Sequence, residues 1–350
     1  MRSALWGALL WSAASQVVAQ GVPVTFEESQ PVAITGFAVV TASFDRVTHQ
    51  NTFAAGKVAL SLFKPAGDVY LFAQLTTALE DGETGTEIDN LIVSWTPHAA
   101  SRWTLGFGRF DAPLGFERDD EPLNLIPTNS FNFAFARPSK LTGALVRYTV
   151  SPKLQLTAAA ANGWGVAIDN NRAKTGMVRL DWQATPGLAL GVAGMYGPER
   201  DSTIMHPRSL LSADLTVDAG RLILGAELNV GREQDDPESL AWAGGAITAF
   251  LRLGRSVGVA ARYDHLGDSD GALTGTGQVL RSVTFGPMWF FQRAQEGIFA
   301  NIERTTFHLP QIAVRTALRL DYSNQDFFAN DEGGLERRNT RGVIEVLYLF

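Results

Sequence analysis

Hydrophobic and polar residues alternate one for one through most of this chain. From residue 222 to residue 230, the even positions read Leu, Leu, Ala, Leu and Val, whereas the odd positions read Ile, Gly, Glu and Asn. The same alternation recurs at 178–183, 257–264 and 312–322. A repeat of two residues places successive side chains on opposite faces of a β-strand. The pattern therefore predicts strands with one apolar face and one face shared by small residues and arginines.

Segments of this kind follow one another from residue 34 to the end of the chain. We count about 16, each near the length of roughly 9–11 residues that a tilted strand needs to cross a bilayer. They lie near residues 34–46, 52–63, 68–79, 88–96, 102–110, 140–150, 153–162, 174–184, 187–197, 208–217, 221–231, 243–253, 256–265, 279–290, 311–323 and 341–350. The sequence therefore predicts an all-β protein.

The connections between these segments are short and long in turn. Short ones such as 64–67 and 185–187 use Pro and Gly as turn residues, whereas long ones such as 111–139 and 324–340 are mostly polar. Because membrane barrels have short periplasmic turns and longer external loops, we predict a transmembrane antiparallel up-and-down β-barrel of about 16 strands. About 18 strands are the alternative, since 292–309 lies on the side of the short turns and could form an extra strand, a periplasmic flap or part of a segment entering the lumen.

The C-terminal strand carries an assembly pattern. Ile344, Val346, Tyr348 and Phe350 fall on one face, and the last residue of the chain is aromatic. This arrangement resembles the terminal β-signal by which bacterial outer-membrane barrels are recognised for assembly. It implies the barrel-assembly machinery as a partner and the bacterial outer membrane as the location.

The N-terminus has the layout of a secretory signal peptide. A single charge at Arg2 precedes an apolar stretch, and small residues stand before a cleavage position after Ala19. We expect residues 1–19 to be the signal peptide, 20–33 a periplasmic N-terminal segment and 34–350 the barrel. No later window offers the roughly 18 consecutive apolar residues of a transmembrane helix.

Composition removes several classes of function. Lys and Arg number 29 against 36 Asp and Glu, the net charge is -7, and the chain contains no Cys. The basic patch of a nucleic-acid-binding protein does not appear, and disulfides, thiolate metal sites and a Cys nucleophile are excluded. The five His residues show no metal-ligand spacing. No catalytic residue, metal site or cofactor site is predicted.

Several motifs in the first half of the chain resemble a known family. The sequence reads G-R-F-D-A-P-L-G-F-E from Gly108, P-S-K-L-T-G from Pro138, N-G-W from Asn162 and D-N-N from Asp169. These motifs resemble the OmpL-like β-barrel porins and, more distantly, phosphate-selective porins. The resemblance implies an outer-membrane channel for small solutes. The chain departs from a phosphate-selective pattern because it has only five Lys residues, none of them clustered.

The polar strand face supplies the candidate pore lining. Its basic members are Lys57, Arg147, Arg179, Arg252, Arg262, Arg315 and Arg319. Its acidic members are Asp181, Asp214, Glu227, Asp264, Asp321 and Glu345. These charges either line water or satisfy one another in a filled interior. About eight strands leave an interior that side chains fill, whereas about 16 leave an aqueous channel, so we favour lining.

The loop 111–139 is the longest connection and the third external one. Its first half carries one basic residue, Arg118, and five acidic residues: Asp111, Glu117, Asp119, Asp120 and Glu121. The loop at this position in general porins folds inward and sets the constriction. If this loop does the same, its carboxylates face the wall arginines across the pore and set ion preference. The alternative is a solvated surface loop whose aromatic stretch 130–135 anchors it.

The first hypothesis for function is a porin through which small hydrophilic solutes or ions diffuse passively. The alternatives are a closed structural or adhesive barrel that displays its loops, and an outer-membrane hydrolase with its site at the loop rim. Expected partners are outer-membrane lipid, the assembly machinery and small solutes or ions, without nucleic acid. A homotrimer is left open, since general porins of this size are often trimers.

Overall fold

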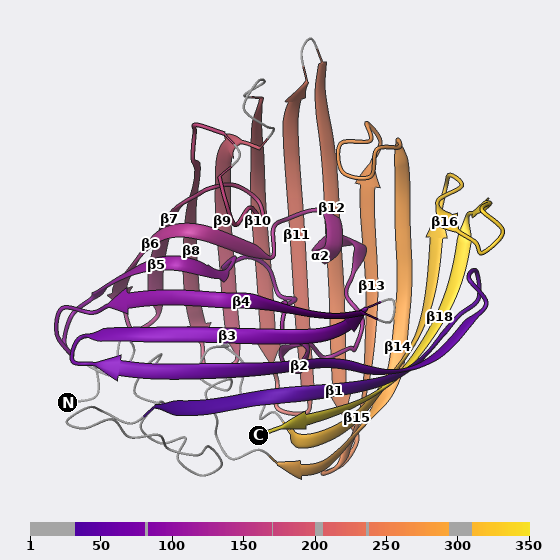
Figure 1. Cartoon of the computed structure of the whole chain (residues 1–350), viewed down its shortest axis with the longest axis horizontal. Helices are drawn as coiled ribbons and strands as arrows, with labels where there is room; N and C mark the ends of the chain where they lie inside the picture. The colour runs from indigo at the N-terminus through magenta and orange to yellow at the C-terminus, as the bar shows by residue number, and fades with distance from the viewer. Residues whose placement is uncertain (1–31, 81–82, 170, 200–205, 236–237, 294–309) are drawn as a thin grey trace.

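The computed structural model describes residues 32–80, 83–169, 171–199, 206–235, 238–293 and 310–350. Within them, sixteen strands form one closed antiparallel barrel in which strands adjacent in sequence are paired (Figure 1). The barrel strands are β1 (Ala33–Asp45), β2 (Gln50–Ala66), β3 (Val69–Glu80), β4 (Glu83–Trp95), β5 (Trp103–Asp111), β6 (Lys140–Ser151), β7 (Leu154–Ala161), β8 (Thr175–Thr185), β9 (Leu188–Pro198), β10 (Pro207–Asp218), β11 (Leu222–Asp235), β12 (Glu238–Arg252), β13 (Val257–Asp268), β14 (Gln278–Arg293), β15 (Pro310–Ser323) and β18 (Arg338–Leu349). The prediction of an up-and-down barrel of 16 strands is confirmed.

The barrel closes between its first and last strands. β1 pairs with β18 from Phe37 opposite Leu349 to Asp45 opposite Arg341. The N–H of Phe350 donates to the carbonyl of Gly36 at 3.0 Å, and the N–H of Gly36 donates back at 2.8 Å. The chain therefore leaves no free edge strand in the barrel, which removes the edge-pairing hazard of an open sheet.

The period-two pattern becomes two different faces of one wall. On β8, Val178 is 55% exposed, whereas the next residue, Arg179, is 2% exposed. The apolar set faces outward, as a hydrocarbon surrounding requires. Trp103 on β5 and Tyr148 on β6 also face outward near the short turns, with ring centroids 4.3 Å apart, in the position of an interfacial aromatic girdle.

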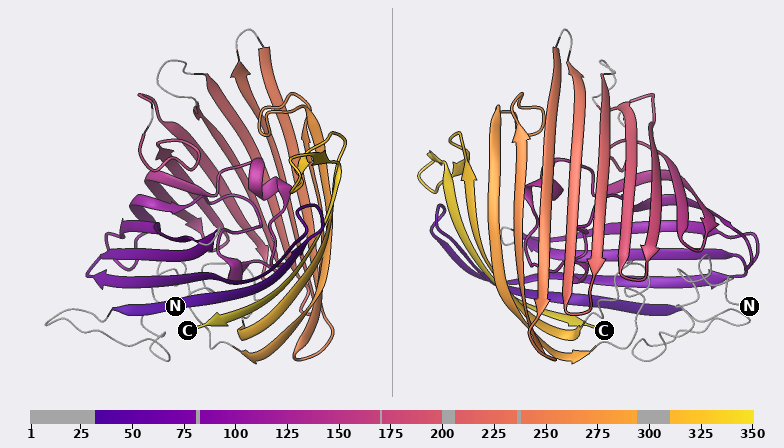
Figure 2. Two further views of the ribbon diagram at one scale, coloured as in Figure 1. Left: turned by 45° about the vertical axis from the view of Figure 1, so that its right-hand side comes forward. Right: turned by 180° about the vertical axis from the view of Figure 1, so that it is seen from behind.

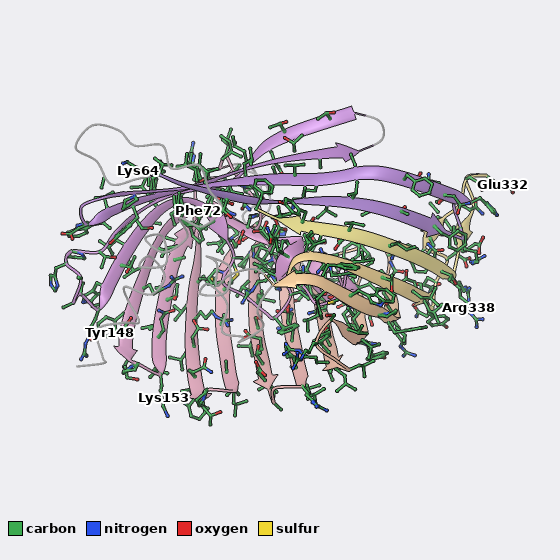
Figure 3. The ribbon with its side chains drawn as sticks, turned by 90° about the horizontal axis from the view of Figure 1, so that it is seen from below. Lys64, Phe72, Tyr148, Lys153, Glu332 and Arg338 are labelled. Atoms are coloured by element: carbon green, nitrogen blue, oxygen red, sulfur yellow. The ribbon has the colours of Figure 1, made fainter. Side chains whose placement is uncertain are left out.

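The two ends of the barrel differ in their connections. Figure 3 labels Lys64 and Lys153 beside short turns and Glu332 and Arg338 in the region of the long connection between β15 and β18. That connection contains the two-residue strands β16 (Phe328–Ala329) and β17 (Leu335–Glu336). Among the described residues, no helix has the length and apolarity needed to cross a membrane.

Three expected features lie outside the described residues. They are the signal peptide 1–19, the periplasmic segment 20–33 except for its last two residues, and residues 294–309 of the stretch 292–309. The domain boundaries at the N-terminus and the role of 292–309 stay predictions.

Candidate functional site

Residues 112–139, which we call the inner segment, run from the end of β5 into the barrel and back to β6. The segment contains a 3-10 turn, η2 (Glu121–Leu123), and the short helix α2 (Phe131–Phe135). In both views of Figure 2, α2 lies within the outline of the barrel wall. Buried apolar residues attach the inner segment to the wall, since Leu125 and Ile126 pack in one cluster with Phe250 and Met288 of the wall.

Glu227 of β11 anchors the beginning and the end of the inner segment. Its carboxylate accepts hydrogen bonds from the N–H of Phe116 at 2.7 Å and from the Nε of Arg137 at 2.5 Å. The amide of Asn229 donates to it at 2.8 Å. A buried carboxylate is stable only when it is paired and hydrogen-bonded, and the inner segment supplies most of these partners.

A second anchor joins the inner segment to β13. Nη1 of Arg262 lies 2.5 Å from Oε1 of Glu117 and also donates to the carbonyl of Thr128. On the same strand, Oδ1 of Asp264 accepts from the N–H of Phe131 at 2.9 Å. Both ends of the 128–131 stretch are therefore attached to inward-facing charges of β13.

The arginines of β15 hold the middle of the segment through its carbonyl groups. Nη1 of Arg315 donates to the carbonyl of Glu121 at 3.0 Å, while its Nε bonds to Glu345 at 2.5 Å. Arg319 bonds to Asp321 at 2.6 Å, donates to the carbonyl of Asn129, and lies 4.5 Å from the centre of the Phe131 ring. These arginines therefore position the loop backbone and are balanced by carboxylates of the wall.

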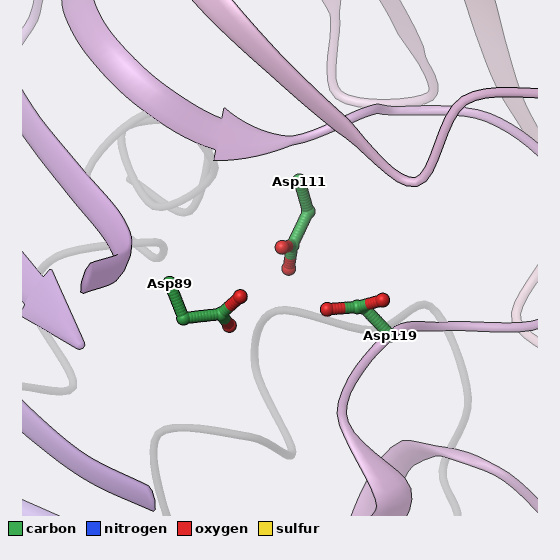
Figure 4. Close-up of side chains that lie close together, drawn as sticks. All are labelled: Asp89, Asp111 and Asp119. Carbon is green, nitrogen blue, oxygen red and sulfur yellow. The ribbon is translucent and has the colours of Figure 1, made fainter. Parts of the chain in front are cut away.

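The carboxylates of Asp89, Asp111 and Asp119 lie close together where the inner segment begins (Figure 4). Nζ of Lys140 lies 2.7 Å from Asp89, 2.5 Å from Asp111 and 3.1 Å from Asp119. Oxygen atoms of the three carboxylates lie within 4.8 Å of one another, a spacing that a metal ion could use. The ammonium group already stands among them, so the cluster is charge-balanced by the chain itself.

Asp120 and Glu121 contact the neighbouring strands β3 and β2, next to this cluster. The amide of Gln74 donates to both oxygens of Asp120, at 3.1 and 3.2 Å, and Glu121 lies 3.2 Å from Nζ of Lys57. Burial, aided by nearby Asp111, raises the pKa of Asp120 to about 8 despite Lys140, Gln74 and Lys57, which lower it. Burial also raises the pKa of Glu121, against the opposing effect of Lys57. The segment thus touches β2 and β3 as well as β11, β13 and β15.

The structure brings most of the predicted site residues together, but in different pairs from those expected. The loop carboxylates were expected to face wall arginines across the pore. Among the residues that the structure describes, Glu117 alone of these carboxylates pairs with an arginine, in direct contact with Arg262. Asp111 and Asp119 pair with Lys140, and Glu121 pairs with Lys57. Most of these carboxylates therefore form direct ion pairs with the wall, and no open gap separates the opposite charges.

The remaining predicted residues lie elsewhere on the wall. Arg179 is paired with Asp181 at 2.7 Å and with Asp214 at 2.6 Å. Within the described part of the chain, the side chains of Arg147 and Arg252 have no hydrogen bond or ion pair. Whether any of these residues lines an open pore or sets ion preference stays a prediction.

Sequence reasoning missed Lys140, Asp89 and Arg137. Alternation places Lys140 on the opposite face from Arg147, but Lys140 is the first residue of β6 and lies buried under the inner segment. Asp89 lies beside a register shift between β3 and β4, where Gln74 pairs with Asn90 and Leu75 with Ile88. This β-bulge turns both Asp89 and Asn90 into the interior. The P-S-K and P-L-G-F-E motifs were the only available signal for these contacts.

Comparisons with known proteins agree with this architecture. The family model "Putative beta-barrel porin-2, OmpL-like" matches residues 72–350. No curated protein matches the chain. Among solved structures, the outer membrane channel DcaP of Acinetobacter baumannii is 10% identical with a TM-score of 0.65 and covers 93% of this chain and 99% of its own.

Two further structures have the same fold. OmpT of Vibrio cholerae is 11% identical with a TM-score of 0.63 and covers 93% of this chain and 100% of its own. The anion-selective porin of Comamonas acidovorans is 10% identical with a TM-score of 0.63 and covers 92% of this chain and 100% of its own. At these identities the likeness establishes the fold, whereas the family match establishes kinship. Together they point to a channel rather than to an enzyme, and the chain belongs to the OmpL-like β-barrel porin family of the bacterial outer membrane.

Proposed function

We propose that this protein is an outer-membrane channel through which small hydrophilic solutes and ions diffuse passively, and that the inner segment is its constriction. The observation that carries the proposal is the attachment of one loop to inward-facing side chains on several sides of a closed 16-stranded wall. A barrel of about 16 strands is wide enough for an aqueous channel. A loop that is fixed across such a lumen narrows the path that a solute follows through it.

Family and neighbours support the same function. The family is one of porins, and the neighbours include an outer membrane channel and an anion-selective porin. Assembly through the C-terminal strand and association into a homotrimer are further parts of the proposal.

A closed structural barrel is the second candidate, and one observation favours it. The inner segment buries Phe131 and Ala136 against Trp242 and Leu266 of the wall, in addition to the cluster at Leu125 and Ile126. Such packing fills part of the lumen with apolar side chains. A filled barrel that displays its external loops has no need of a solute path.

Single-channel recording on the refolded full chain separates the two candidates. We expect stable open steps in a planar bilayer from protein whose heat-modifiable band shows a folded barrel. Silence from protein that is folded by the same criterion would overturn the channel and favour the closed barrel.

A further inference from the structure

We propose that Arg147, with the hydroxyl group of Thr104, forms a binding site for an oxyanion group, either a carboxylate or a phosphate, on the inner face of the wall. The proposal rests on the channel function proposed above, because it names the chemical class of solute that the same lumen binds. It concerns β5, β6 and β7, on the far side of these strands from the outer aromatic girdle.

Arg147 faces the lumen. The next residue on β6, Tyr148, stacks against Trp103, which is 50% exposed on the outer face. Successive side chains of a strand point to opposite faces. Leu145, two residues earlier on the same face as Arg147, is buried in the cluster that contains Leu114 of the inner segment. Arg147 therefore projects into the interior, nearer to the short turns than this cluster.

Arg147 differs from most inward-facing arginines because it has no acidic partner among the described residues. Arg179, Arg262 and Arg319 each have a carboxylate oxygen at 2.5–2.7 Å. Among the residues that the structure describes, none forms a hydrogen bond or ion pair with the side chain of Arg147, and its Nε is buried without a partner. A buried donor without a partner is costly, and because Arg147 as a whole is only partly buried, its guanidinium is open to an anion that enters from the lumen.

The inward-facing carboxylates of β8 and β10 do not pair with this guanidinium. On β8, Asp181 bonds to Nε of Arg179, and on β10, Asp214 bonds to Nη1 of the same arginine. Arg252 also lacks a partner among the described residues, but it is the last residue of β12, beside an exposed turn where water can solvate it. Arg147 is therefore an inward-facing arginine within the wall whose charge no described carboxylate compensates.

Hydroxyl groups flank Arg147 on both sides. Thr104 of β5 and Thr157 of β7 are its register partners. Residues directly opposite on one face have Cβ atoms about 4.5–5.5 Å apart. Thr157 is 1% exposed and packs beside the stem of Arg147, whereas Thr104 is only partly buried, so its hydroxyl is the one open to an anion. The hydroxyl of Thr104 lies 3.1 Å from that of Thr96. One of these two protons is used between them, and the other is left to donate to an anion.

These donors match an oxyanion. A guanidinium presents parallel N–H groups that fit two oxygens of a carboxylate or phosphate, and charge-assisted hydrogen bonds of this kind are the strong ones. The Thr104 hydroxyl extends the same set of donors to a third oxygen. A spherical halide uses only one point of this array, so the site selects for planar or tetrahedral oxyanions.

The experiment uses the refolded full chain and inorganic phosphate or acetate as the probe. Binding is measured by titration calorimetry in detergent, and conductance is measured at fixed KCl with and without phosphate. We expect Arg147→Gln to weaken phosphate binding at least about tenfold. Arg147→Lys, which keeps the charge and loses the fork, is expected to bind more weakly than the parent and serves if the first variant fails to fold. Arg102→Gln, at an exposed arginine before β5, is the matched control.

The outcomes separate this site from the channel function. Equal phosphate binding by parent, Arg147→Gln and Arg147→Lys, or no binding by the parent, overturns the site. If the parent binds phosphate through Arg147 but never conducts, the site stands and the channel fails. If the parent conducts but no binding depends on Arg147, the channel stands and the site fails.

Discussion

Gly115 of the inner segment lies so close to Glu227 of β11 that a Cβ atom at position 115 would come within 2.1 Å of Oε2. Gly115 also has a φ of +68°, a backbone conformation that disfavours residues with a side chain. The glycine of the P-L-G-F-E motif therefore lets the N–H groups of Phe116 and Glu117 reach the buried carboxylate.

We expect Gly115→Ala to loosen the inner segment while the wall stays folded. The positive φ alone costs about 1 kcal/mol, and displacement of Glu227 adds to it. Hydrogen exchange at Phe116 and Glu117 should accelerate, and channel noise should rise. Gly67→Ala is the matched control, since Gly67 has a φ of +62° but no atom lies within 4 Å of its Cβ position. Equal exchange in both variants would contradict the anchoring role of the contact.

The pKa of Asp120, raised by burial to about 8, predicts a pH dependence of the inner segment. The ordinary pKa of this carboxyl group is 3.8. Between pH 3.8 and about pH 8, Asp120 therefore keeps its proton in the native state and loses it in the unfolded state. Stability therefore falls as pH rises from about 4 to about 8 and levels off above that. Protection of the segment from hydrogen exchange should decrease over this window.

Asp120→Asn tests this prediction, because asparagine cannot ionise and can still accept one bond from Gln74. In this variant, protection of the inner segment from hydrogen exchange should depend less on pH, and protection at pH 8 should exceed that of the parent. Asp326→Asn, at an exposed pair with Arg337, should leave the slope unchanged. An identical slope in parent and Asp120→Asn would show that another group titrates.

The wall could be read from the sequence because it obeys one local rule. Alternation sorts Arg179 inward and Val178 outward without any knowledge of their neighbours, and Pro and Gly mark the turns. The inner segment obeys no such rule. Its contacts join residues more than a hundred positions apart, as between Phe116 and Glu227, and no period along the chain encodes that separation.

Alternation also failed where a strand was irregular. Lys140 stands at the first position of β6, where the inner segment rather than lipid covers it. Asp89 enters the interior through a bulge that shifts the register of β4 by one residue. Lysine and aspartate at these positions meet because the bulge and the strand end coincide in space, which is a property of the closed barrel rather than of either strand.

The C-terminal residue closes the barrel, and its removal should block assembly. The backbone of Phe350 exchanges two hydrogen bonds with Gly36, and its ring stacks on Tyr348 with centroids 6.1 Å apart. We expect Phe350→Ala to reduce insertion into the outer membrane and to leave protease-sensitive periplasmic chain. Phe53→Ala, at a phenylalanine that is 93% exposed, controls for loss of an aromatic ring. A folded, heat-modifiable band at parental level in Phe350→Ala would refute the assembly signal.

Neutralising three carboxylates of the inner segment should shift ion preference towards anions. In the Asp119→Asn, Asp120→Asn and Glu121→Gln triple variant, Lys57 loses its partner Glu121, whereas Lys140 loses Asp119 but keeps Asp89 and Asp111. The lumen therefore loses negative charge, and the positive charge of Lys57 is uncovered. The reversal potential measured in dilute salt should therefore shift towards anion preference. The shift should shrink near 1 M salt, where the Debye length falls to about 3 Å from about 8 Å at physiological ionic strength.

The Asp326→Asn variant, at an exposed pair with Arg337, is the control and should keep the parental reversal potential at every salt concentration. A triple variant that conducts with parental selectivity in dilute salt would place the ion path away from Lys57 and Lys140, and therefore away from the inner segment.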